Sequence, residues 1–296
     1  LEASHHKIRS QMKSSVLHND HLSELHTKGF TIMRNAIPKP SIESAIAGYY
    51  SICDQMDSQR QANLKANGRN SRLVNSHLAS EAISSLFLNE QLLDLCDTFF
   101  GGRITSIYTS LFFQEGTKQP LHRDAPVFCT LPENLFLGCW FALEDSRIEN
   151  GALMGVPFSN QTFIDDYYNR YKIGRERLEE TDAIKFSDDI TWAKYQKYVN
   201  NMCAMLGLKQ EAIEVDAGDI IVWHPLFLHG GLPHKSEATR HSVVMHVAPE
   251  GAQVHGSYLF FTPQNPIQER SMAYIEVPGS SRKMKQDLVT FSPDRQ

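Results

Sequence analysis

Apolar and polar positions follow different patterns in different parts of the chain. The N-terminal third is mostly helical in pattern, and we predict helices over residues 41–60, 79–87 and 89–100. The first follows two prolines and takes Ser41 as its candidate N-cap, and the last ends at a glycine pair. These helices indicate a support that precedes the main sheet framework.

From about residue 103 the pattern changes to short runs rich in Ile, Val, Tyr, Thr and Phe, separated by Gly, Pro, Asn and Asp. Such runs are typical of β-strands. Eight of them cover residues 103–114, 127–131, 135–143, 152–156, 212–215, 219–223, 241–248 and 258–261. A series of short strands with frequent turn residues indicates a barrel or a two-sheet jelly roll.

Residues 159–210 interrupt this series with a charged segment of helical character. Its large apolar residues from Trp192 to Met205 fall mostly at spacings of three and four, and Gly207 can end that helix. We predict a helical insertion in the sheet framework. It either covers the functional site as a mobile lid or packs as a static buttress.

The predicted organisation is therefore one domain over residues 1–296, mainly β with helices (the α+β class). Helical support occupies about residues 1–100, and a jelly-roll core occupies residues 103–262, including the insertion. Residues 263–296 are expected to form a C-terminal tail.

Composition narrows the range of partners. The net charge of the 296 residues is -5, and no long run of Lys or Arg concentrates positive charge. This disfavours a nucleic-acid surface or an anionic membrane and favours a small-molecule partner. No apolar stretch approaches the roughly 20 residues that span a bilayer, and no secretory signal is expected. The five cysteines are odd in number and lack a C-x-x-C motif, which fits a reducing cytoplasm better than a disulfide framework.

The first candidate for chemistry is the H-x-D motif of His122 and Asp124. Alternate residues of a strand point to the same side, so the imidazole and the carboxylate can reach one point. Taken alone, the motif is weak evidence, and a surface histidine beside a solvated aspartate explains it better. It needs a third ligand to indicate a metal site.

The segment 218–231 supplies two candidates for that ligand, His224 and His229. An apolar strand leads into a turn that places His229 beside a glycine pair, where backbone or ligand can approach closely. We prefer His229 for this reason, and because Arg240 follows it by eleven residues. His241 and His246, on the strand after Arg240, are expected to have core or surface roles.

Arg240 stands at the head of a mostly apolar strand, so its side chain is expected to be buried. A buried guanidinium needs an anion, and its planar fork suits a carboxylate. The anion is either a ligand's carboxylate or, as an internal salt bridge, one of the 34 acidic residues.

Two histidines and one carboxylate leave coordination positions open, as in non-haem iron(II) oxygenases. We therefore interpret His122, Asp124 and His229 as catalytic metal ligands for Fe(II). A chelating keto acid and dioxygen would fill the open positions, with Arg240 binding the far carboxylate of the keto acid. The alternatives are a cupin-like zinc hydrolase or isomerase, in which the metal activates water, and a catalytically silent ligand-binding barrel.

The order of these motifs resembles the phytanoyl-CoA hydroxylase-like (PhyH) family of Fe(II)/2-oxoglutarate-dependent dioxygenases. Residues 140–145 and 149–153 look like the W-x-A-L-x-D and E-N-G-x-L segments of that family, and residues 29–34 are similar to its opening strand. The resemblance covers about residues 22–248 and implies a double-stranded β-helix core. It also implies Fe(II), with 2-oxoglutarate and dioxygen as cosubstrates, and release of succinate and carbon dioxide as a small-molecule substrate is oxidised.

By position in this family, Trp140 lines the cosubstrate pocket, and Thr109 is a further candidate for the same wall. Two positions depart from the family pattern. The usual P-G-S-H is here Pro157-Phe-Ser-Asn160, and the Ser often found two residues after the second histidine is Gly231. Asp124 is retained where halogenating relatives carry Ala or Gly, which favours hydroxylation over chlorination.

Overall fold

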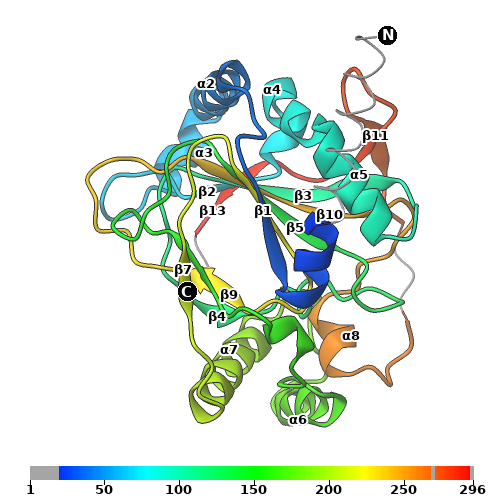
Figure 1. Cartoon of the computed structure of the whole chain (residues 1–296). Coiled ribbons are helices and arrows are strands. Elements are labelled where there is room, and N and C mark those ends of the chain that lie inside the picture. The colour runs from blue at the N-terminus through cyan, green and yellow to red at the C-terminus, as the bar shows by residue number, and fades with distance from the viewer. Residues whose placement is uncertain (1–19, 268–270, 294–296) are drawn as a thin grey trace.

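Two β-sheets form the centre of the protein, which we describe from a computed structural model over residues 20–267 and 271–293 (Figure 1). The larger sheet contains β1 (Phe30–Met33), β2 (Arg72–Val74), β3 (Thr105–Phe113), β5 (Leu137–Ala142), β8 (Ile220–Trp223), β10 (Ser242–Pro249), β11 (Tyr274–Glu276), β12 (Lys283–Lys285) and β13 (Thr290–Ser292). The smaller sheet contains β4 (Gln119–His122), β6 (Leu153–Gly155), β7 (Glu211–Ile213) and β9 (His229–Gly231).

The strand order of the larger sheet is β1-β8-β5-β10-β3-β12-β11, with β2 beside β3 and β13 beside β2. The smaller sheet has the order β4-β9-β6-β7. All the central pairings are antiparallel, and β12 meets β3 in parallel. The described strands thus form open sheets rather than a closed barrel. The prediction of a mainly β jelly roll with helices is confirmed.

Strand β10 shows how alternation divides the core. Val243, Met245 and Val247 belong to the apolar cluster shared with the N-terminal helices. Val244 instead packs in the cluster that contains Trp140 and residues of β8. Because successive side chains of a strand point to opposite faces, every second residue of β10 is directed to the inner side of the sheet. The functional site lies on this inner side.

The N-terminal helices are α2 (Lys39–Gln55), α3 (Asp57–Ala62), α4 (Glu81–Ser84) and α5 (Glu90–Phe99), and Figure 1 shows α2, α4 and α5 on one side of the larger sheet. The predicted helices are confirmed with shifted bounds. The assignment of Ser41 as N-cap is wrong, because α2 begins at Lys39 and Pro38 occupies the cap without a side-chain bond. A proline in the first turn is tolerated, since its missing N–H has no partner there.

Two of the eight predicted strands are wrong. Residues 127–131 form a turn, because the N–H groups of Val127 and Phe128 donate to the carbonyl oxygen of Asp124 (2.9 and 3.0 Å). Residues 258–261 lie in the short helix α8 (Ser257–Phe261), where every side chain is buried. A short run that is apolar at every position has no period, so its pattern does not distinguish a strand from a buried helix. The other six runs correspond to β3, β5, β6, β7, β8 and β10.

The insertion is helical, as predicted, with α6 (Tyr167–Leu178) and α7 (Asp189–Met205) between β6 and β7. The region that the sequence indicated as a tail carries β11, β12 and β13 within its described part. Its strand β12 pairs with β3, and β13 pairs with β2. No helix in the described residues is long and apolar enough to cross a membrane.

Two histidines, the buried His77 and the partly buried His224, should make the stability of the fold depend on pH. Burial lowers the pKa of His77 to about 3 and that of His224 to about 4. A histidine of the unfolded chain titrates at about pH 6.5. Below that pH, and down to the lowered pKa values of the folded state, the unfolded chain therefore binds more protons than the folded one. The free energy of unfolding should therefore fall, by a few kcal/mol in all, as the pH is lowered from about 6.5 to 4.5.

Urea unfolding at several pH values measures this dependence. The variant His77→Asn keeps a polar partner for Ser110, whose Oγ lies 2.7 Å from Nδ1 of His77, but does not titrate in this range. Its unfolding free energy should change less steeply with pH than that of the wild type. Identical slopes for the two proteins would contradict the assignment to His77.

Candidate functional site

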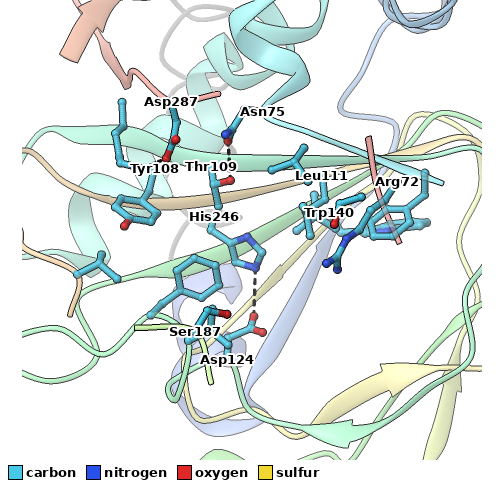
Figure 2. Close-up of a pocket in the computed structure, with 18 of the residues that line it drawn as sticks. Arg72, Asn75, Tyr108, Thr109, Leu111, Asp124, Trp140, Ser187, His246 and Asp287 are labelled. Atoms are coloured by element: carbon cyan, nitrogen blue, oxygen red, sulfur yellow. Dashed lines mark hydrogen bonds and ion pairs between the residues drawn. The ribbon is translucent and has the colours of Figure 1, made fainter. Parts of the chain in front are cut away.

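A cavity of about 770 Å³ is lined by residues of both sheets and of α7 (Figure 2). A volume of this size is in the range of small-molecule sites. All six predicted site residues contribute to its wall: Thr109, His122, Asp124, Trp140, His229 and Arg240.

The first two metal-ligand candidates lie at the end of β4. His122 is the last residue of the strand, and Asp124 follows two residues later at the start of a turn. Between them, Arg123 is buried among other partners: it pairs with Asp165 and donates to the carbonyl oxygen of Ser159 (2.6 Å). The extended backbone thus directs His122 and Asp124 to one side and Arg123 to the other, as the H-x-D motif predicts.

His229 comes from β9, which pairs with β4 in the register His122 to His229. The two imidazole centroids are 4.5 Å apart. The glycine pair after His229 is required by the close approach of β4: a Cβ at Gly230 would lie 2.6 Å from the carbonyl oxygen of Gln119, and one at Gly231 would lie 2.1 Å from that of Thr117. This contact explains the departure from the family's serine at Gly231.

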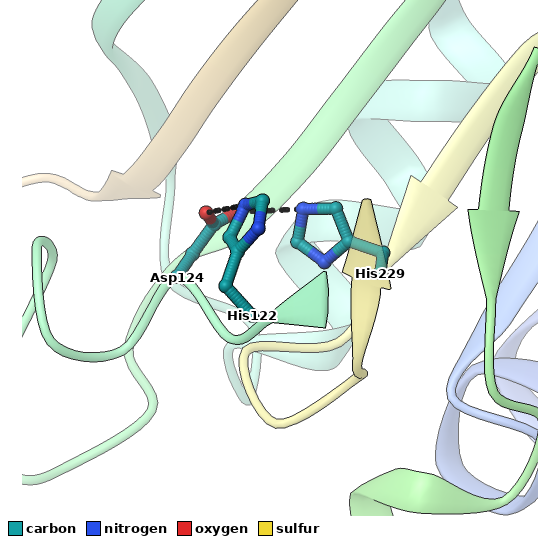
Figure 3. Close-up of side chains that lie close together, drawn as sticks. All are labelled: His122, Asp124 and His229. Atoms are coloured by element: carbon teal, nitrogen blue, oxygen red, sulfur yellow. Dashed lines mark ion pairs between the residues drawn. The ribbon is translucent and has the colours of Figure 1, made fainter. Parts of the chain in front are cut away.

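The ligand atoms of His122, Asp124 and His229 lie within 4.8 Å of one another (Figure 3). Nε2 of His122 is 3.8 Å from Oδ1 of Asp124, and Nε2 of His229 is 3.7 Å from Oδ2. Nδ1 of His122 lies 2.8 Å from the carbonyl oxygen of Pro120, and Nδ1 of His229 lies 3.1 Å from that of Phe227. Because a carbonyl oxygen can only accept, these contacts favour a proton on each Nδ1, the tautomer in which Nε2 of a neutral imidazole can bind a metal.

The electrostatics favour the charge states that metal ligands need. Burial lowers the pKa of His229 to about 4, although Asp124 acts to raise it. Burial acts to raise the pKa of Asp124, but His229 and His246 outweigh it and hold that pKa below its usual range. At neutral pH the site therefore combines a neutral imidazole at His229 with a carboxylate, and two imidazoles with one carboxylate fit a divalent first-row metal.

Arg240 is buried in the same cavity, and its guanidinium is only partly used. NH1 donates to the carbonyl oxygen of Gly151 (2.6 Å) and NH2 to Oγ of Ser242 (3.2 Å), while Nε has no acceptor among the described residues. No carboxylate of the described chain forms an ion pair with Arg240, so the internal salt bridge is not observed there. Burial lowers its pKa to about 10, which leaves it charged at neutral pH. A buried cation with unused donors fits the carboxylate of a ligand.

Trp140 and Thr109 stand on the inner face beside this site. The guanidinium carbon of Arg240 lies 5.2 Å from the ring centre of Trp140, so the indole forms a wall next to the candidate anion site. Oγ1 of Thr109 donates to Oδ1 of Asn75 (2.7 Å), as Figure 2 shows. The hydroxyl hydrogen of Thr109 is therefore used within the protein, and only its oxygen lone pairs remain for a ligand.

The rival histidine, His224, lies apart from this cluster. Its Nδ1 accepts from the N–H of Leu226 (3.1 Å), and its ring packs 5.5 Å from that of Phe99. The structure therefore brings His229, and not His224, to the H-x-D pair.

His246 is the site residue whose position the sequence did not indicate. Its Nε2 lies 3.3 Å from Oδ2 of Asp124 (Figure 2). Its ring stacks on that of Phe128, with the ring centroids 4.1 Å apart. His246 thus has the core role that was expected, but it lies beside the metal-ligand candidates. The available signal was alternation, because Val244 and His246 continue the inner face of β10.

The altered P-G-S-H segment also has a local explanation. Phe158 replaces the glycine of that pattern and adopts a left-handed backbone conformation (φ 66°), which non-glycine residues rarely take. Its side chain is exposed, so the ring meets no packed neighbour that would exclude it. The neighbouring Asn160 donates from Nδ2 to the carbonyl oxygen of His26 (2.7 Å), which ties this turn to the N-terminal region.

Solved structures with the same fold include two whose descriptions name the predicted cosubstrate. The non-heme alpha-ketoglutarate-dependent carbocyclase SnoK from nogalamycin biosynthesis aligns with a TM-score of 0.59 at 15% identity, covering 85% of this chain and 93% of that one. EctD from S. alaskensis, solved with 2-oxoglutarate and 5-hydroxyectoine, aligns with a TM-score of 0.56 at 13% identity, covering 79% and 76%. At such identity the likeness concerns the fold, and it supports the jelly-roll assignment.

Sequence comparison gives the relationship. The human peroxisomal phytanoyl-CoA dioxygenase is 22% identical over 200 residues, which cover 65% of this chain and 51% of the relative. Phytanoyl-CoA dioxygenase 1 of Oryza sativa subsp. japonica is 27% identical over 164 residues, covering 50% of each. The matched segment thus spans about half the length of these relatives. A model of the family described as phytanoyl-CoA dioxygenase (PhyH) matches residues 25–242, and the chain belongs to this family.

Proposed function

We propose that this chain is a non-haem iron(II) and 2-oxoglutarate-dependent oxygenase that oxidises a small molecule and releases succinate and carbon dioxide. The observation that carries the proposal is the pairing of two sites in one cavity. Three buried ligand atoms converge within 4.8 Å, and a buried arginine with unused donors lines the same space. Membership of the PhyH family supports the same chemistry.

When bound, iron(II) and 2-oxoglutarate activate dioxygen for the oxidation of an unreactive C–H bond. The chain supplies the surroundings for this reaction. His122, Asp124 and His229 hold the metal and leave coordination positions open. Arg240 binds the carboxylate of 2-oxoglutarate that is remote from the metal, and Trp140 and Thr109 form the wall beside it. Burial of these groups keeps bulk water from the reacting atoms.

The two alternative functions explain fewer features. A zinc hydrolase or isomerase would use the triad, but it has no need for a buried, partly unpaired arginine opposite the metal. A silent binding barrel would need neither the convergent lone pairs of His122 and His229 nor the charged state of Asp124.

Part of the cavity wall lies beyond the family match. The family match ends at residue 242, whereas part of the cavity wall comes from residues 271–292 of the C-terminal strands. Aromatic residues such as Tyr108, Phe128 and Trp192 line the same cavity as polar ones such as Lys285 and Asp287. We propose that the substrate has mixed polarity. We also propose that the C-terminal strands belong to the same domain as the rest of the cavity wall. The cytoplasmic location expected from the cysteines stays a prediction.

A spectroscopic titration tests the proposed function. Anaerobic addition of iron(II) and then 2-oxoglutarate should produce a weak metal-to-ligand absorption in the visible, which a zinc enzyme would not show. Incubating the iron-loaded protein with metabolite pools in air should then reveal fractions that stimulate succinate release. A protein that forms no such complex, or that never releases succinate, would favour one of the alternatives.

The insertion supplies another wall, and α7 is firmly attached to β4. The ring of Trp192 packs 5.2 Å from that of His122, and Nδ2 of Asn200 donates to the carbonyl oxygen of Leu121 (2.9 Å). Of the two predicted roles, these contacts favour the buttress for α7. We propose that a covering movement is confined to residues 179–187, which connect α6 to α7 and bring Phe186 to the cavity wall.

Limited proteolysis distinguishes these roles. Cleavage within residues 179–187 should slow severalfold when iron(II) and 2-oxoglutarate are added without oxygen, while α7 should stay intact with and without them. Equal cleavage rates in both conditions would leave the whole insertion as a static buttress.

A further inference from the structure

Two hydrogen-bond donors meet on one oxygen of Asp124. Nε1 of Trp223 donates to Oδ2 at 2.9 Å, and Nε2 of His246 lies 3.3 Å from the same atom. All three side chains are buried. A carboxylate oxygen has two lone-pair sites, so these two donors engage Oδ2 fully. The other oxygen, Oδ1, keeps its lone pairs and lies 3.8 Å from Nε2 of His122, while Nε2 of His229 lies 3.7 Å from Oδ2.

This arrangement is built across three neighbouring strands of the larger sheet. Gly138 of β5 pairs with Trp223 of β8 on one side and with His246 of β10 on the other. A Cβ at Gly138 would lie 2.1 Å from the indole Cε2 of Trp223 and 2.4 Å from its Nε1. Only a residue without a side chain at this position lets the indole lie across β5 and direct its N–H at Asp124.

The orientation of His246 is set by a stacked ring on one face and by the contact of Nε2 with Asp124. Phe128, which the turn after Asp124 brings into place, stacks on the imidazole at 4.1 Å with an interplanar angle of 25°. Nδ1 of His246 is buried and has no partner among the described residues. A proton on Nε2 therefore makes a hydrogen bond to Asp124, whereas a proton on Nδ1 would make none. The contacts thus favour a proton on Nε2, where it can be donated to Asp124.

We infer that Trp223 and His246 are positioning residues that occupy Oδ2 of Asp124 and present Oδ1 alone to the metal. The inference rests on the proposed metal site. Outer partners of ligating groups typically change metal affinity by about 10–100-fold, because they fix the orientation of the ligand. A carboxylate held by one oxygen also preserves the open coordination positions that a chelating cosubstrate and dioxygen require.

Cobalt(II), added alone to the purified protein, provides a test whose readout is not activity. Trp223→Phe and His246→Leu should each weaken cobalt binding by about 10–100-fold and alter the ligand-field absorption of the bound ion. His246→Gln offers a side-chain N–H near the position of Nε2, so it should restore affinity and spectrum toward those of the wild type. The matched control His241→Leu changes a histidine next to the same strand that bonds Glu144 rather than Asp124, and it should bind as the wild type does.

The outcomes separate this inference from the proposed function. Thermal unfolding without metal identifies variants that fail to fold, and the folded ones are compared. If Asp124→Ala loses cobalt while Trp223→Phe and His246→Leu keep wild-type affinity and spectrum, the positioning role is overturned and the metal site stands. Equal losses in His246→Leu and His246→Gln would overturn the hydrogen-bonding role of His246. A wild-type protein that binds no cobalt would overturn the metal site and this inference together.

Discussion

Replacing His229 by alanine should abolish high-affinity iron(II) binding and 2-oxoglutarate turnover, while His224→Ala should retain both. The expected loss exceeds the roughly 10–100-fold typical of outer partners, because the change removes one of three ligand atoms. His229 holds its Nε2 3.7 Å from Asp124, whereas His224 is bonded to Leu226 and packed on Phe99. Anaerobic iron(II) titration followed by succinate measurement checks both variants.

The two histidines form a matched pair for this purpose, because His229 is buried, His224 is partly buried, and loss of contact with water lowers the pKa of each to about 4. A general loss of stability on removing a buried imidazole should therefore affect both variants similarly, and unfolding curves can compare them. Loss of iron by His224→Ala with retention by His229→Ala would show that the assignment of the second histidine is wrong.

Local composition is the reason that much of the fold could be predicted. Strands β3, β5, β8 and β10 are rich in β-branched and aromatic residues and bounded by turn residues, so their existence follows from local sequence. The C-terminal strands are only three residues long and mixed in polarity. They form by pairing with the free edges of β3 and β2, and the local sequence of a three-residue strand does not indicate which edge it will pair with.

The candidate site divides in the same way. His122 and Asp124 are two residues apart, and the glycine pair marks His229, so local spacing was enough to nominate all three. The contacts of Trp223 and His246 with Asp124 depend on the register of three strands that are far apart in sequence. The need for a glycine at position 138 is visible only in that register, because the side chain that requires the space is that of Trp223, 85 positions later (223 − 138).

The second large effect is expected at Arg240. Replacing it by alanine should raise the 2-oxoglutarate concentration needed for turnover by two to three orders of magnitude, with iron(II) binding largely kept. Removing one partner of a buried ion pair typically costs about 3–5 kcal/mol, and about 1.4 kcal/mol corresponds to a factor of ten. The guanidinium is close enough to the triad to share one cavity, but it makes no contact with the three ligand side chains.

Two control variants define what the arginine contributes. Arg240→Lys keeps a charge but lacks the planar fork, so its 2-oxoglutarate requirement should lie between those of the wild type and Arg240→Ala. Ser242→Ala removes the neighbour that accepts from NH2 at 3.2 Å and should have a smaller effect, because the charge and the remaining donors stay. Since Arg240→Ala leaves the carbonyl oxygen of Gly151 without its donor, unfolding curves must accompany the kinetics. A folded Arg240→Ala protein with wild-type 2-oxoglutarate dependence would show that the cosubstrate carboxylate binds elsewhere, and that the unused donors of this buried arginine serve another ligand.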